Sequence, residues 1–376
     1  MRCLKIVVLT GKRGGFGAMR PMLRLFNTCP YFNLEIIATD QHLDKKFGNT
    51  IKEIEKDFPR IHKIPLNQKA DTSFERNRSM SKLIMGLSKY FNEKKPDLLI
   101  LYGDRSEILA AAMCATHHNI LIGHIQGGDL TGNIDDSIRH AVTKLSHLHF
   151  VSCKDSYERV RKMGEEKWRI FLVGDNHIDP IIEKSFTKSR EVRKKFNITK
   201  DLILFLFHPE TLSPNKNYNI IKRYLLFLLS LDKQVVAIYP CSDNGYEKII
   251  KILESLKSKK NFTLFKNIDS YDFLGLMNIA DILVGNSSAG IIEAPYFNLP
   301  SINIGERQRN RSGVKNVINV GYEFESFREI VKKTNRNHVG KKFKKIYGLG
   351  DTGQKIFQAI LKLNKTKKEL FNKINK

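Results

Sequence analysis

The sequence predicts an α/β protein with two Rossmann-like domains that face a cleft. Short apolar runs of strand length alternate with stretches of helical spacing, which is typical of doubly wound parallel sheets. The alternation stops at a charged, glycine-free segment, residues 181–201, and then restarts. A chain of 376 residues with 41% hydrophobic content is long enough for two cores.

The first half supplies the elements of the first domain, which we place at residues 1–182 on the sugar and catalytic side. Leucine-rich and β-branched runs predict strands at 5–11, 34–39, 97–104, 120–128 and 147–153. Helical spacing marks 20–29, 74–95, 105–118 and 136–147. We expect a tight turn at "GKRGG" and a first helix that starts near Ala18.

The second half repeats the pattern and predicts a nucleotide-binding domain at residues 183–376 with a basic C-terminal helix. Its expected strands are 202–210, 234–243, 262–267, 281–288 and 300–306, and its clearest helices are 220–233 and 246–260. Segment 181–201 reads as the linker. The carboxyl ends of all these strands are expected to point into the cleft, where such folds bind ligands.

Composition restricts the class of protein. "GKRGG" follows the N-terminal apolar run where a signal peptide would need more apolar residues, and "YLLFLLSL" is too short to span a bilayer. We therefore expect a cytoplasmic protein without membrane insertion. The five cysteines are scattered and lack C-x-x-C spacing, so neither a disulfide framework nor a zinc site is indicated.

The net charge of +25 comes from lysines and arginines spread along the whole chain. No basic motif interleaved with aromatic residues accompanies them. We interpret the charge as solvated basic faces and expect no nucleic-acid partner; a surface that binds a polyanion is the alternative.

Polar residues gather at the expected carboxyl ends of the strands. The first half places there Arg13, Asp104, Arg105, Gln126, Asp129, Asp135, Asp136 and Arg139. The second half places there His208, Asn286, Ser287, Ser288, Glu293 and Arg307. Each could have a structural role alone: a tight turn at Arg13, a helix cap or internal ion pair at Asp104 and Arg105, a satisfied histidine at His208.

In their order, "GDR", "HIQGGDLTGNIDDSIRHAVTKLSH", "HPET", "GNSSAGIIEA" and "GERQRNR" resemble the hydrolysing UDP-N-acetylglucosamine 2-epimerases. The resemblance runs from Thr10 to about Gly321. It implies a GT-B type fold and a reaction without metal or redox cofactor. The nucleotide diphosphate would leave by elimination across C1 and C2 of the sugar to give a glycal, and water would then add to release the sugar inverted at C2.

The resemblance also implies roles for single residues. Asp104 and Asp135 match catalytic carboxylates, and His42 matches a histidine near the sugar. The nucleotide-binding positions fall on Arg13, Arg105, His208, Ser287, Ser288, Glu293 and Arg307, and we add Arg139 and Asn286 as candidate substrate-binding residues.

Gln126 departs from that family, whose members carry a third catalytic carboxylate, a glutamate, at this point of the motif. An amide cannot take up a proton at neutral pH. We expect Gln126 to read a substituent of a modified sugar, while Asp129, Asp136 or Asp135 alone handles the proton.

These observations predict a hydrolysing nucleotide-sugar 2-epimerase that converts UDP-N-acetylglucosamine and water to N-acetylmannosamine and UDP. The product would feed a sialic or other nonulosonic acid pathway, or surface polysaccharide synthesis. The same reaction on UDP- or GDP-N,N′-diacetylbacillosamine is the close alternative. A GT-B glycosyltransferase and a nucleotide-sugar-binding protein without activity are the alternatives from other classes. Besides the nucleotide sugar, the expected partner is the chain itself, in a homodimer or homotetramer.

Overall fold

The computed structural model describes residues 3–210, 218–311, 316–336, 345–363 and 367–371. The chain divides into two compact units, each built on a parallel sheet. The first unit comprises Met1–Leu130, Asp135–Glu183 and Ile346–Lys376, and the second comprises Thr131–Ile134 and Lys184–Lys345. The predicted class, two Rossmann-like α/β domains, is confirmed.

The sheet of the first unit has seven strands in the order β3-β2-β1-β4-β5-β6-β7. The strands are β1 (Leu4–Thr10), β2 (Phe32–Thr39), β3 (Ile61–Ile64), β4 (Leu98–Tyr102), β5 (Leu121–Ile125), β6 (Leu148–Val151) and β7 (Ile170–Leu172). The strands β3 and β7, which form the two edges of the sheet, were not predicted from the sequence. Both are short and partly exposed, so they lack the continuous apolar run that marks a central parallel strand.

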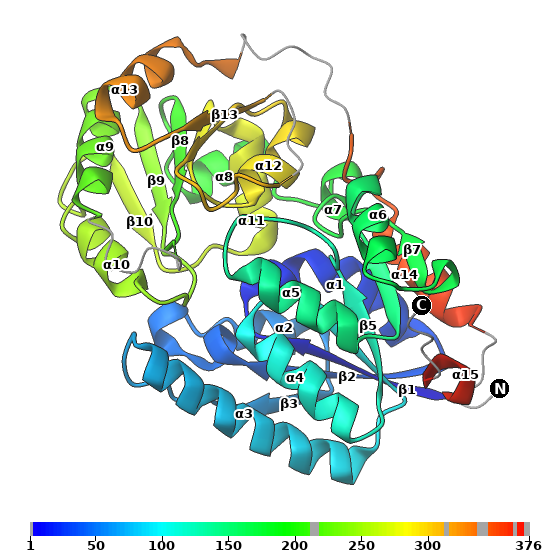
Figure 1. Cartoon of the computed structure of the whole chain (residues 1–376). Coiled ribbons are helices and arrows are strands. Elements are labelled where there is room, and N and C mark those ends of the chain that lie inside the picture. The colour runs from blue at the N-terminus through cyan, green and yellow to red at the C-terminus, as the bar shows by residue number, and fades with distance from the viewer. Residues whose placement is uncertain (1–2, 211–217, 312–315, 337–344, 364–366, 372–376) are drawn as a thin grey trace. The chain divides into compact units, whose positions relative to one another are not determined.

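Helices cover both faces of this sheet (Figure 1). Because side chains alternate along a strand, Ile6 and Val8 face one layer and Val7 and Leu9 face the other. The first layer contains α1 and α14, and the second contains α3 and α4, which pack side by side. The helices of the unit are α1 (Arg13–Thr28), α2 (Ile51–Asp57), α3 (Ser73–Lys94), α4 (Ser106–His117), α5 (Asp135–Leu145), α6 (Lys154–Lys162), α7 (Asp179–Ile182), α14 (Thr352–Leu361) and α15 (Lys367–Phe371).

Helix α1 begins at Arg13, earlier than the predicted start near Ala18. Glycines favour turns because they lose much conformational freedom in a helix, which is why the sequence predicted a turn at "GKRGG". Tertiary packing decides otherwise: the Phe16 ring is fully buried and meets the rings of His42 and Phe58 edge-on, at 6.1 and 6.0 Å between centroids. The helix also continues through Pro21.

The C-terminal part of the chain returns to the first unit, so the boundaries of the predicted second domain, 183–376, differ from the structure. Helix α14 packs on α1. Its start is held by Asp179, whose carboxylate accepts hydrogen bonds from the backbone N–H groups of Thr352 and Gly353, at 2.9 and 2.6 Å. Of the predicted basic C-terminal helix, the structure describes α15; residues 364–366 and 372–376 lie outside the described residues.

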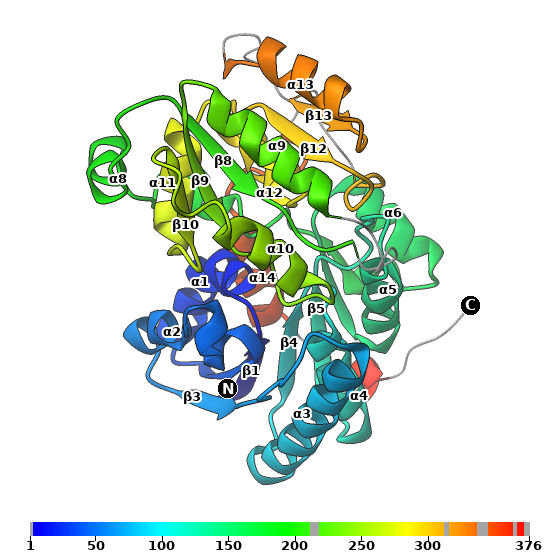
Figure 2. The same ribbon diagram turned by 90° about the vertical axis from the view of Figure 1, so that its left-hand side faces the viewer.

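The second unit has a six-stranded sheet in the order β10-β9-β8-β11-β12-β13. Helices α9 and α10 lie along this sheet in Figure 2. Helix α8 lies inside the expected linker and packs on α11. The strands are β8 (Leu202–Leu206), β9 (Gln234–Ile238), β10 (Phe262–Phe265), β11 (Ile282–Gly285), β12 (Ser301–Ile304) and β13 (Val317–Val320). The helices are α8 (Ser189–Lys195), α9 (Asn219–Ser230), α10 (Tyr246–Glu254), α11 (Ser270–Ile279), α12 (Ala289–Ile292) and α13 (Phe324–Lys333).

None of the helices in the described ranges combines the length and apolar character needed to cross a membrane.

Gly285 allows β8 and β11 to approach each other at their carboxyl ends. Its φ is +146°, and a Cβ atom there would lie 1.7 Å from the carbonyl oxygen of Leu206. Gly285→Ala must therefore displace backbone, and we expect it to lower the free energy of unfolding by about 1–3 kcal/mol or more. Urea unfolding followed by circular dichroism measures this loss. Gly321→Ala is the control, because a Cβ there meets nothing within 4 Å; equal stability of the two variants would contradict the prediction.

Candidate functional site

The predicted site residues form two clusters, one in each unit, at the carboxyl ends of parallel strands. In the first unit they follow β2, β4 and β5 or lie on α1 and α5. In the second unit they follow β8, β11 and β12. This is the edge at which doubly wound sheets bind ligands.

Asp104 is held at the end of β4 by a buried arginine. Its carboxylate accepts a hydrogen bond from Nη2 of Arg139, whose side chain is fully buried. Nη1 of Arg139 donates to the backbone carbonyl of Gln126, at 2.8 Å. One guanidinium thus ties together the segments that follow β4 and β5. The predicted substrate-binding residue Arg139 is committed to positioning within the protein.

His124 stabilises the segment that carries Asp104. Its Nε2 lies 2.8 Å from the carbonyl oxygen of Gly103, and its Nδ1 lies 3.2 Å from the hydroxyl of Thr143. Burial lowers the pKa of His124 to about 3. The ring is therefore neutral at neutral pH, and Nε2 must carry the proton that Gly103 accepts. His124 fixes the residue that precedes Asp104.

Gln126 adopts a backbone conformation that is rare for a residue with a side chain, with φ at +65°. Its amide nitrogen donates to Oδ2 of Asp175 at 2.6 Å, and the residue is 7% exposed. The NH2 group is thus used inside the protein, which leaves the amide oxygen for a sugar substituent. That Gln126 recognises a substituent of a modified sugar stays a prediction.

The three other predicted aspartates have different surroundings. Asp129 is buried, and its Oδ1 accepts hydrogen bonds from the hydroxyls of Ser152 and Ser156, both at 2.5 Å. Asp135 and Asp136 lie in the first turn of α5 and are half-buried. A negative charge is favourable at that end of a helix. Asp129 therefore ties its loop to the start of α6, and the pair on α5 is the more accessible.

Arg105 and His42 are engaged by neighbours within the first unit. Arg105 contacts Glu107 at 2.8 Å and Asp40 at 3.3 Å, and Arg76 contacts the same two carboxylates. The ring nitrogens of His42 lie 3.0 Å from the hydroxyl of Thr10 and 2.7 Å from that of Thr50. Burial lowers the pKa of His42 to about 3, so its ring is neutral at neutral pH.

Arg13 is the first residue of α1 and is half-buried. Its charge contributes to the low pKa of His42, after the larger effect of burial and that of Glu107, which opposes it. The positive charge of Arg13 therefore lies close enough to the His42 ring to lower the pKa of that ring.

Three further residues of this cluster were not predicted from the sequence. Asp175 and His177 follow β7, and Tyr102 ends β4. Oδ1 of Asp175 lies 2.8 Å from Nδ1 of His177, which lies 2.9 Å from the hydroxyl of Tyr102. The motif "GDNH" after the apolar run "IFLV" was the available signal, because it repeats the pattern of polar residues directly after a strand.

In the second unit, Asn286 organises the candidate nucleotide site. Its amide oxygen accepts from the backbone N–H of His208 at 2.6 Å, and its amide nitrogen donates to the carbonyl of His208 at 2.9 Å. The side chain of Asn286 is therefore committed to the chain after β8. Nδ1 of His208 accepts from the backbone N–H of Cys241 at 3.1 Å, so a neutral His208 carries its proton on Nε2 and can donate to an anion.

The other predicted residues of the second unit lie around Asn286. Arg307 lies 3.4 Å from the carbonyl oxygen of Asn286 through Nη1 and 3.5 Å from Asp243 through Nη2. Ser287 and Ser288 precede α12 and are half-buried, and Glu293 follows this helix and is 5% exposed. The cluster thus contains a cation, a histidine donor and two hydroxyls, the groups that bind a diphosphate.

Comparisons with known proteins identify the family to which this chain is similar. The family model described as UDP-N-acetylglucosamine 2-epimerase matches residues 25–361. A protein of Legionella pneumophila named UDP-N,N′-diacetylbacillosamine 2-epimerase (hydrolyzing) is 33% identical, over 99% of this chain and 99% of its own. A Neisseria meningitidis protein named UDP-N-acetylglucosamine 2-epimerase is also 33% identical, over 85% of this chain and 84% of its own.

Among solved structures, the UDP-GlcNAc 2-epimerase of Methanocaldococcus jannaschii in complex with UDP-GlcNAc and UDP has a similar fold. The TM-score is 0.79 at 21% sequence identity, over 95% of this chain and 99% of the other. The two sheets therefore belong to the GT-B fold of these enzymes, as the resemblance implied. From the family model and the relatives at 33% identity, this chain belongs to the UDP-N-acetylglucosamine 2-epimerase family.

Proposed function

We propose that this protein is a hydrolysing nucleotide-sugar 2-epimerase. The observation that carries the proposal is the Asp104 carboxylate, held at the end of β4 by the fully buried Arg139. In a family that acts on nucleotide sugars, this arrangement supplies a fixed carboxylate for proton transfer. Asp104 and Asp135 act on the sugar during elimination of the nucleotide diphosphate and addition of water to the glycal.

For the substrate, UDP-N-acetylglucosamine is the first candidate, with N-acetylmannosamine and UDP as products. UDP- or GDP-N,N′-diacetylbacillosamine is the second candidate. It is supported by the Legionella pneumophila relative, which matches over 99% of both chains. The Neisseria meningitidis relative has the same identity but matches over less of each chain. Either product would enter a nonulosonic acid or surface polysaccharide pathway.

Incubation with each nucleotide sugar in D2O, followed by NMR, tests the function. We expect free nucleotide and a C2-inverted sugar that carries deuterium at C2, because the C2 proton is exchanged during elimination and readdition. Release of nucleotide only after addition of an acceptor would instead identify a glycosyltransferase. Binding without turnover of any donor would identify a nucleotide-sugar-binding protein.

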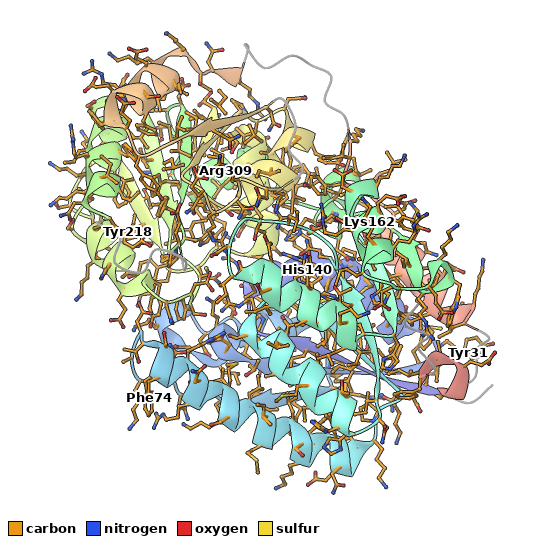
Figure 3. The ribbon with its side chains drawn as sticks, in the orientation of Figure 1. Tyr31, Phe74, His140, Lys162, Tyr218 and Arg309 are labelled. Carbon is orange, nitrogen blue, oxygen red and sulfur yellow. The ribbon has the colours of Figure 1, made fainter. Side chains whose placement is uncertain are left out.

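Nucleotide capture by Arg307 gives a separate prediction. Arg307→Ala should weaken UDP binding about 10- to 100-fold, since a hydrogen bond to a charged group contributes about 1.5–3 kcal/mol. Isothermal titration calorimetry with UDP and GDP measures the change. Arg309, which is labelled in Figure 3, supplies the matched control Arg309→Ala from the same motif. Its side chain is 74% exposed and pairs with Glu306. Equal affinities of the two variants would remove Arg307 from the nucleotide site.

A further inference from the structure

Glu210 is a buried carboxylate in the segment that follows β8. Its Oε1 accepts a hydrogen bond from the hydroxyl of Tyr322 at 2.5 Å and another from the backbone N–H of Glu306 at 3.0 Å. Tyr322 follows β13, and Glu306 follows β12. One carboxylate oxygen thus joins the segments that follow three strands of the second unit.

Gly305 permits this close approach because it has no side chain. Its φ is +77°, and a Cβ atom there would lie 2.3 Å from Oε1 of Glu210 and 2.4 Å from the hydroxyl oxygen of Tyr322. The backbone N–H of Gly305 donates to the carbonyl of Val320, the last residue of β13, at 2.8 Å. The backbone at positions 305 and 306 is therefore held by β13 at one residue and by the Glu210 carboxylate at the next.

Tyr322 fixes the orientation of that carboxylate. Burial raises the pKa of Tyr322, and the hydrogen bond to Glu210 raises it further. The hydroxyl therefore keeps its proton and donates it to Oε1 of Glu210. A hydrogen bond to a carboxylate is stronger than one to a neutral oxygen. The oxygen that binds the backbone of Glu306 is thus held in one place.

The segment that carries Glu210 is itself fixed. The backbone N–H of Glu210 donates to the hydroxyl of Tyr218 at 3.1 Å. Two residues earlier, the N–H and the carbonyl of His208 are both bound by the side chain of Asn286. Asn286 follows β11, which lies between β8 and β12 in the sheet. Glu210 therefore holds the segment after β12 from a defined position.

Arg307, the candidate nucleotide-binding residue, comes directly after Glu306. Its guanidinium lies 3.4 Å from the carbonyl oxygen of Asn286 and 3.5 Å from Asp243. Both distances are long for hydrogen bonds, so these contacts alone hold a long side chain weakly. The hydrogen bond from Glu306 to Glu210 instead fixes the backbone from which the Arg307 side chain extends.

We propose that Glu210 is a positioning residue of the nucleotide site, which holds the backbone beside Arg307 so that the guanidinium meets the diphosphate, and that Tyr322 orients Glu210. The proposal rests on the proposed function, and within it on nucleotide capture by Arg307. A carboxylate and a diphosphate repel each other. Glu210 therefore acts through the backbone of Glu306 and not by contact with the nucleotide.

Glu210→Ala tests this role, because it removes both hydrogen bonds of Oε1. We expect UDP binding to weaken about 3- to 30-fold, within the range by which residues of one hydrogen-bonded network affect one another. Glu210→Gln keeps an oxygen that can accept and should recover part of the affinity. Isothermal titration calorimetry is run where circular dichroism shows each variant folded. Unchanged UDP affinity of Glu210→Ala would overturn the proposal and leave the proposed function standing.

Glu254→Ala is the matched control from the same unit. Glu254 is the last residue of α10, and it accepts a hydrogen bond from the hydroxyl of Tyr239. The variant thus removes a second carboxylate that binds a tyrosine, at a position outside the candidate nucleotide-binding residues. We expect it to bind UDP as the wild type does. A loss of affinity equal to that of Glu210→Ala would overturn the proposal.

A double-mutant cycle separates positioning of Arg307 from a general structural role. If Glu210 acts through Arg307, Glu210→Ala should change the UDP affinity by less than about twofold once Arg307→Ala is present. The same loss in both backgrounds would overturn the proposal. If the two residues are coupled but no nucleotide sugar is turned over, the positioning role stands and the proposed function falls. If the wild type binds neither UDP nor GDP, both fall.

Hydrogen exchange of the wild type, followed by NMR, keeps the test independent of whether the variants fold. The backbone N–H of Glu306 donates to a buried carboxylate, so we expect it to exchange more slowly than in an unstructured peptide of the same sequence. The protection should be lost in Glu210→Ala. Exchange of the Glu306 amide at the rate of the unstructured peptide in the wild type would overturn the proposal.

Discussion

Replacing Arg139 by methionine is expected to lower the free energy of unfolding of the first unit by about 3–5 kcal/mol, because removing one partner of a buried ion pair leaves the other without compensation. Asp104 would lose its guanidinium partner, and the backbone carbonyl of Gln126 would lose a donor. Turnover should be lost as well, since the same contacts hold the candidate carboxylate. The single tryptophan, Trp168, lies in the first unit, so its fluorescence during urea unfolding reports this unit.

Two controls make this result specific. Arg139→Lys keeps the charge but replaces the planar guanidinium, which reaches two acceptors, by a single ammonium group, so an intermediate loss is expected. Arg161→Met removes an arginine whose side chain is 47% exposed and pairs with Glu158 at 3.7 Å. Such surface pairs contribute about 0–1 kcal/mol. Equal stability of Arg139→Met and Arg161→Met would mean that the buried guanidinium does not hold the site together.

Asp104→Asn is expected to reduce kcat by about 10²- to 10⁴-fold, the range for removal of a catalytic acid or base. The amide keeps the shape of the side chain and an oxygen for Arg139, but it cannot exchange a proton. Some stability will be lost with the charge, so the assay is run at a temperature where circular dichroism shows the variant folded. Free nucleotide and deuterated sugar in D2O are the readout, and leakage of the glycal would be a further sign.

The neighbouring aspartates on α5 provide the matched comparison. Asp135→Asn should reduce turnover as Asp104→Asn does, whereas Asp136→Asn, one residue further in the same helical turn, should have a smaller effect. UDP affinity is measured in all three variants and should be unchanged, because none of the three aspartates is among the candidate nucleotide-binding residues. Near-normal turnover of Asp104→Asn would show that its carboxylate does not act on the sugar.

Much of this protein could be predicted from local sequence. Central strands such as β4 and β8 are fully buried on both faces, so they appear as continuous apolar runs that end in polar residues. The same rule located Asp104 and His208. It failed for the edge strands β3 and β7, whose partly exposed residues give no such run. Because β7 was missed, the polar residues that follow it, Asp175 and His177, were missed as well.

The sequence by itself determined the two-fold repetition of the α/β pattern, the family and the identity of the polar residues at the strand ends. Only the tertiary structure decided which of these residues face one another. The single guanidinium of Arg139 joins Asp104 to Gln126 across separations of 35 and 13 residues, and Gln126 reaches Asp175 across 49 residues. The physical reason is that local pattern records which side chains a strand or helix can bury, whereas hydrogen bonds between strand ends depend on the order in which the strands pair in the sheet.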